Sequence, residues 1–93
     1  MSRVELRQRL NQIKMNKNED PKTLFEQIGA VRNAYNTRAK KIDEEDLIAV
    51  ILDAAPERYQ AVLTAEQRAH KRANDLNCGH LAKAMQDHFR ILS

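Results

Sequence analysis

The segment from residue 42 to residue 56 constrains the fold more than any other part of this sequence. After Ile42 come the acidic residues 43–46 and then six uncharged apolar residues at 47–52, and the segment ends at Pro56. Acidic side chains stabilise the unpaired amides in the first turn of a helix, and Asp43 fits the N-cap position. Proline cannot continue a helix without losing a hydrogen bond. The segment therefore predicts a helix over residues 43–54.

This expected helix carries apolar residues on more than one side. One stripe comprises Ile48, Ile51, Leu52 and Ala55, and a second stripe comprises Leu47, Val50 and Ala54. A surface helix needs cover on one apolar side, whereas a helix with two apolar sides must be covered twice. Two interpretations follow. The segment is either the central helix of a small bundle, or a helix whose second stripe contacts another molecule.

Four further segments carry helical periodicity or the residues that start helices. Ser2 and Glu5 have capping-box spacing, and Asp20 followed by Pro21 is a strong start signal. Pro56 can open a fourth helix where the third one ends. The helices are expected over residues 2–15, 21–38, 43–54, 56–73 and 77–92.

The composition agrees with an all-helical protein. Only two glycines and two prolines occur among 93 residues, which argues against sheets with tight turns. The connections between the expected helices are short, as in helical bundles. We predict that residues 1–93 form one domain, an all-α, compact five-helix bundle. Its core is expected to contain Leu10, Ile13, Leu24, Ile28, Ile51, Leu52, Leu63, Leu81, Met85 and Phe89.

Basic residues gather near the start of a chain whose net charge is +3. A basic helix can contact phosphates, although a solvated helix face has the same composition. RNA binding is therefore an alternative prediction, through Arg3, Arg7, Arg9, Lys14 and Lys17. No membrane partner is expected, because the longest apolar run is far shorter than the roughly 20 residues of a membrane span. The single cysteine and the lack of a secretory leader indicate a reducing compartment.

No set of residues predicts catalysis, a cofactor or a metal ion. His80 and His88 are too far apart on one expected helix to share a metal, and Cys78 has no partners at zinc-motif spacing. The two glycines lie fifty residues apart and cannot form a phosphate-binding loop. Capping explains the acidic residues 43–46 better than cation binding does, because consecutive helical side chains point in different directions. We expect a protein that is not an enzyme and has no small-molecule substrate.

The order of three segments carries a further signal. Residues 6–15 read LRQRLNQIKM, an acidic start follows at 43–46, and residues 51–59 read ILDAAPERY. These segments resemble the patterns L-x-x-L-x-x-L-K-M and D-E-x…L-L-x-x-L-P-x-x-Y of the Gag polyprotein of copia-type LTR retrotransposons. The resemblance extends over about residues 6–92 and departs at Ala55, where the family usually has leucine.

The resemblance implies a fold and a role. The chain would be the C-terminal half of a capsid protein, similar to a retroviral-type capsid C-terminal domain, and would have a structural function. Self-association would assemble cytoplasmic virus-like particles that package RNA. The helix over residues 43–53 would then form the dimer, and we expect its contacts at Leu47, Val50 and Ala54. A third alternative is a domesticated adaptor that binds a peptide between the second and third helices.

Overall fold

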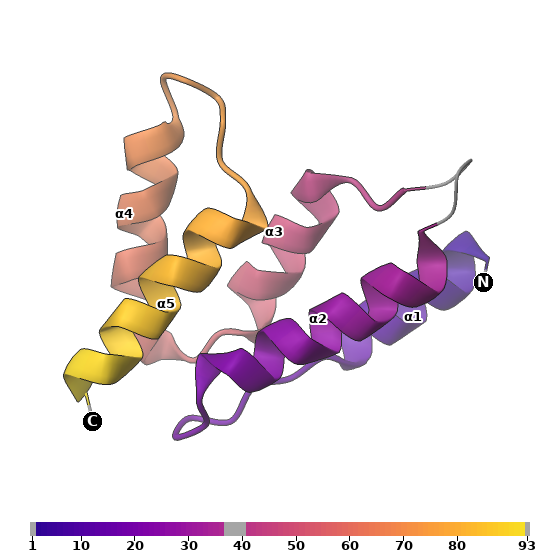
Figure 1. The fold of residues 1–93 in the computed structure, drawn as a ribbon, viewed down its shortest axis with the longest axis horizontal. Helices are drawn as coiled ribbons and strands as arrows, with labels where there is room; N and C mark the ends of the chain where they lie inside the picture. Colours follow the sequence, from indigo (N-terminus) through magenta and orange to yellow (C-terminus); the bar gives the residue numbers. More distant parts are fainter. Residues whose placement is uncertain (1, 37–40, 93) are drawn as a thin grey trace.

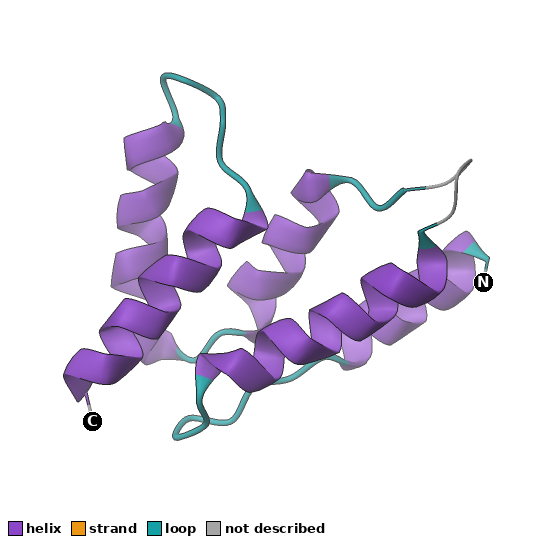
Figure 2. Ribbon diagram, in the orientation of Figure 1, coloured by secondary structure: helices purple, strands orange, loops and turns teal. Residues whose placement is uncertain are grey.

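The computed structural model describes residues 2–36 and 41–92, and in this part of the chain all regular structure is helical (Figures 1 and 2). The helices are α1 (Arg3–Gln12), α2 (Pro21–Tyr35), α3 (Glu44–Ala54), α4 (Gln60–His70) and α5 (Cys78–Leu92). A short 3-10 turn, η1 (Glu57–Tyr59), leads into α4. The prediction of a compact all-α globule with five helices is confirmed for these residues.

Two of the predicted N-caps form as the sequence indicates. Ser2 Oγ accepts a hydrogen bond from the Glu5 amide at 3.2 Å, and Asp20 Oδ1 accepts one from the Lys22 amide at 2.9 Å. Asp43 occupies the N-cap of α3 but makes no side-chain hydrogen bond there. Its side chain therefore contributes only negative charge near the first turn, while its backbone carbonyl accepts hydrogen bonds from the Asp46 and Leu47 amides.

Several predicted helix ends differ from the observed ones. The first helix stops at Gln12 because Ile13 adopts an extended conformation. The fourth begins later than predicted, since η1 follows Pro56, and it ends at His70 before a turn containing Asn74 at φ 52°. Asparagine tolerates this left-handed conformation better than most residues. The second ends at Tyr35, and residues 37 and 38 of the predicted helix lie outside the described residues.

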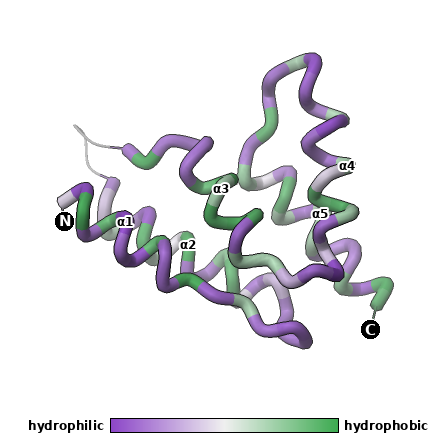
Figure 3. The backbone as a smooth tube through the Cα atoms, turned by 180° about the vertical axis from the view of Figure 1, so that it is seen from behind, coloured by the Kyte–Doolittle hydropathy of each residue, from purple (hydrophilic) through white to green (hydrophobic). Residues whose placement is uncertain are grey.

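The helices form a flat arrangement, and α5 joins its parts. The Cα positions extend over 39 × 32 × 17 Å. The helix α5 runs obliquely past α3 and α4 and contacts α2, α3 and α4, whereas α1 packs against α2 (Figure 1). Viewed from behind, the end of α5 is apolar (Figure 3), and Ile91 there is 80% exposed. None of the described helices is long and apolar enough to cross a lipid bilayer.

Eight of the ten residues predicted for the core are buried, while Leu52 and Phe89 lie half-buried at its edge. The core also takes in residues that the prediction left out, which are Leu6, Met15, Val31, Tyr35, Leu47, Ala54, Ala55 and Tyr59. Tyr59 is the largest of the fully buried side chains. The core therefore draws on every helix of the described chain.

Candidate interaction surface on α3 and α4

The inward face of α3 includes two of the residues predicted for the dimer contact. Leu47 and Ala54 are 1% and 9% exposed and share one side of the helix with Ile51. Helices α2 and α5 cover this side. Leu47 therefore offers no surface to a second folded copy, and Ala54 offers little. The two predicted stripes thus do not stay separate: Leu47, Ile51 and Ala54 form the inward face, while Ile48, Val50 and Leu52 lie half-buried on its flanks.

Val50, the third predicted contact residue, is half-buried on the flank of α3 that faces α1. It borders a hollow of about 280 Å³ together with Arg3 and Arg7 of α1 and Asp46 and Asp53 of α3. Val50 thus remains partly accessible, in a hollow that is also lined by charges of both signs.

The basic residues of the first segment do not form one continuous surface. Arg3 and Arg7 are four residues apart and share one side of α1, whereas Arg9 lies on another side. Lys14 and Lys17 follow the end of the helix, and all five side chains are exposed. Arg3 and Arg7 border the 280 Å³ hollow together with Asp46 and Asp53 of α3, and Lys14 borders a smaller hollow with Asp53. RNA contact by the basic residues stays a prediction.

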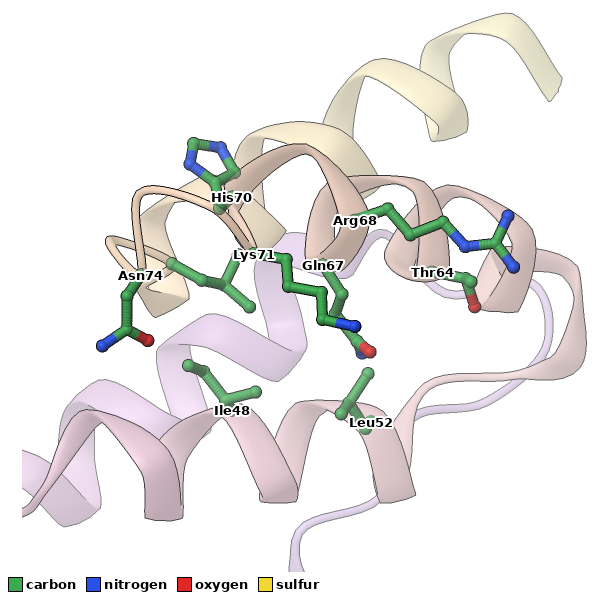
Figure 4. Close-up of a pocket in the computed structure, with 9 residues that line it drawn as sticks. Ile48, Leu52, Thr64, Gln67, Arg68, His70, Lys71 and Asn74 are labelled. Atoms are coloured by element: carbon green, nitrogen blue, oxygen red, sulfur yellow. The ribbon is translucent and has the colours of Figure 1, made fainter.

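The opposite flank of α3 borders an open hollow of about 520 Å³ between α3 and α4. Ile48 and Leu52 point from α3 toward α4, while Gln67 and Lys71 extend from the α4 side toward α3 (Figure 4). Apolar side chains of α3 thus face polar and basic ones across the hollow. The lining residues are Ile48, Leu52, Thr64, Gln67, Arg68, His70, Lys71, Asn74 and Leu76.

The loop that closes one end of this hollow is held by two histidines. His70 Nδ1 lies 2.7 Å from Asp75 Oδ1, and His70 Nε2 lies 3.3 Å from Glu66 Oε2. The hydrogen bond from His70 lowers the pKa of the Asp75 carboxyl. Asn77 Oδ1 accepts from the His80 amide at 3.1 Å, and His80 Nδ1 accepts from the Asn77 amide at 3.3 Å. This reciprocal pair caps the start of α5.

The first residue of α3 takes part in a junction of three helices. Arg32 of α2 lies 3.7 Å from Glu44 Oε1 and donates to Cys78 Sγ at 3.0 Å. The Cys78 amide donates to Glu44 Oε2, also at 3.0 Å. These contacts connect α2, α3 and α5 at the start of α3. Sequence reasoning missed this junction, because its residues lie 34 and 46 positions apart.

The described residues carry no arrangement that indicates metal chemistry. No group of three or more histidine, cysteine, aspartate or glutamate side chains is placed to hold a metal ion. His88 packs edge-on against Tyr59, with ring centroids 5.6 Å apart.

No protein-family model, curated protein or solved structure matches this chain.

Proposed function

We propose that this chain is a structural domain of the Gag capsid type, which associates with copies of itself in the assembly of virus-like particles that package RNA. The resemblance of residues 6–15 and 51–59 to copia-type Gag supports the role. The observation that carries self-association is the half-exposed apolar flank of α3. Ile48 and Leu52, with Leu76, border an open hollow of about 520 Å³ that the described chain leaves uncovered.

Exposed apolar surface next to a groove favours contact with another molecule, because covering it removes apolar area from water. Each Å² so buried contributes about 25 cal/mol. A contact of modest size can suffice for assembly. A closed shell repeats the same contact many times, so that each one can be weak in isolation.

RNA binding by the first segment is the alternative. Arg3 and Arg7 border the same hollow as Asp46 and Asp53, whose negative charges reduce the local attraction for phosphates. Arg9 lies on a different side of α1. The basic residues therefore do not combine into one strong site, and this favours self-association as the role of the domain itself.

The test is the mass of the chain in solution as a function of concentration, measured by sedimentation equilibrium. We expect the mass to rise above 10.7 kDa as the concentration increases. A mass that stays at 10.7 kDa up to about 1 mM, where a contact of about 4 kcal/mol would be half-formed, overturns the proposal. A monomer that binds RNA with steep salt dependence favours the alternative.

A further inference from the structure

We infer that α3 of one copy lies in the hollow between α3 and α4 of a second copy, in a contact that each copy makes with the other. This inference rests on the proposed function and names the surface that carries it. It also replaces the predicted contact at Leu47 and Ala54, which the chain buries in its own core.

The hollow is apolar on one side and basic on the other. Ile48 and Leu52 supply the apolar side from α3, while Arg68 and Lys71 belong to the opposite side. Both basic side chains are exposed, and no carboxylate is found among the residues that line the hollow. Such a groove fits a helix that presents acidic residues beside apolar ones.

The outward side of α3 is a strip of that kind. Glu45, Ala49 and Asp53 follow one another at intervals of four residues, so they share one side of the helix, and all three are exposed. Ile48 and Leu52 lie between this strip and the buried face, since both are half-buried. Ala49, at the centre of the strip, is small enough to let another helix approach closely.

In a dimer with a two-fold axis, the acidic strip of α3 and the basic side of the hollow both face their complement on the other copy. In a symmetric dimer, if residue i of one copy contacts residue j of the other, then j also contacts i. The acidic strip of each copy would lie against Arg68 and Lys71 of the other, and Ile48 and Leu52 of both copies would lie between them. The side chains along α3 of one copy would pack into the groove next to α3 of the other copy, as ridges and grooves of neighbouring helices commonly do. Opposite charges meet in this arrangement.

Charge reversal tests the inference directly. One variant carries Arg68→Glu and Lys71→Glu, which makes both halves of its surface acidic. The second carries Glu45→Lys and Asp53→Lys, which makes both halves basic. These four side chains are exposed, and Asp53, which also borders the hollow with Arg3 and Arg7, makes no ion pair within 4.0 Å among the described residues. Circular dichroism should therefore show native helical content in both variants. Each variant alone should lose self-association by about tenfold or more, because like charges then face each other.

Mixing the two variants is the decisive measurement. The all-acidic and all-basic surfaces complement each other in both halves of the dimer, so a 1:1 mixture should recover an associated species in sedimentation. A control with Arg9→Glu and Lys17→Glu changes the net charge as much as Arg68→Glu with Lys71→Glu does, but at positions away from the hollow. This control should associate like the unmodified chain.

The outcomes separate the inference from the proposed function. Reversed variants that associate like the unmodified chain, or a mixture that stays monomeric, overturn the inference while self-association itself stands. An unmodified chain that remains monomeric overturns the proposed function as well, and the hollow then belongs to an occupant other than a second copy.

Discussion

The imidazole ring of His70 stacks on that of His80, with centroids 3.9 Å apart and planes 14° from parallel. His70 lies at the end of α4 and His80 in the first turn of α5. Because His70 also bonds to Asp75, the stacked pair holds the loop between the two helices. This loop forms one end of the hollow between α3 and α4. The stacked pair therefore helps to position one wall of the hollow.

Replacing Asp75 should change how stability depends on pH. The hydrogen bond from His70 lowers the pKa of Asp75, so ionised Asp75 contributes stability above its ordinary range near about pH 4. This contribution is lost as the pH falls through the lowered pKa. Asp75→Asn should therefore melt below the unmodified protein at pH 6, and the difference should vanish in strong acid. Thermal melts monitored by circular dichroism measure both points.

A matched control is Asp87→Asn, because Asp87 lies 3.8 Å from Arg90 in an exposed pair one helical turn away. The two aspartates are equally exposed, but Arg90 is 78% exposed whereas His70, the partner of Asp75, is 22% exposed. Pairs in which both members are exposed contribute little. The control should therefore melt close to the unmodified protein at pH 6. A difference for Asp75→Asn that persists unchanged at about pH 2, below the ordinary range of every carboxyl group, would contradict the explanation.

Replacing Tyr59 by phenylalanine should stabilise the protein. The ring is fully buried, its hydroxyl has no hydrogen-bond partner among the described residues, and burial raises its pKa. Removing an unpaired buried hydroxyl relieves a penalty of about 1–3 kcal/mol. Urea unfolding should show a higher unfolding free energy for Tyr59→Phe and, because the ring itself fills the core, a loss of about 3–5 kcal/mol for Tyr59→Ala.

The same hydroxyl gives a pH signature at the alkaline end. Its raised pKa means that the neutral form is favoured in the folded chain. Stability is therefore retained below about pH 10, the ordinary value for tyrosine, and falls as the pH rises through the raised pKa. Tyr59→Phe should show a smaller alkaline loss. Equal losses in the two proteins would assign the effect to other groups.

Leu47 should behave as a core residue rather than as a contact residue. Because its side chain is 1% exposed, Leu47→Ala should lower the unfolding free energy by about 2–5 kcal/mol. Ala49→Gln, on the exposed side of the same helix, should change it by about 0.5 kcal/mol or less. Urea titration distinguishes the two. A stable Leu47→Ala protein that has lost self-association would return Leu47 to the interface.

Any RNA binding by the first segment should depend more on Arg9 and Lys17 than on Arg3 and Arg7. Arg3 and Arg7 border a hollow together with two carboxylates of α3, which partly offset their charge, and Lys14 borders another with Asp53. Glutamine at Arg9 and Lys17 should weaken binding to single-stranded RNA and reduce its salt dependence. Glutamine at Arg3 and Arg7 should have the smaller effect. Fluorescence anisotropy at two salt concentrations measures both quantities, and the opposite order would contradict the structural argument.

Local signals in the sequence were sufficient to predict the helices but not how α3 is turned. Asp20 and Pro21 start α2 as expected, because capping depends on neighbours in sequence. The periodicity of α3 could not show whether Leu47 faces inward, since both apolar stripes looked alike. Leu47 faces inward because α2 and α5 cover that side of α3, and this packing appears only in the folded chain.

Tyr59 is a second residue whose position could not be predicted from the sequence. It follows Pro56 and was expected within the first turns of a longer helix, but the proline leads into the 3-10 turn η1 and the ring enters the core. The hollow between α3 and α4 was also beyond sequence reasoning, which placed a peptide groove between the second and third helices. The hollow is lined by α3, α4 and the loop that follows α4, and α5 packs against both helices.

The position of α5 bears on how the chain acquires its structure during synthesis. Helix α5 covers parts of α2, α3 and α4, so their apolar faces stay open to solvent until residues 78–92 have left the ribosome. A nascent chain that stops short of Cys78 would expose Leu47 and Ile51 and would be prone to capture by chaperones or to aggregation. The native packing of α2, α3 and α4 therefore forms only after α5 has been synthesised.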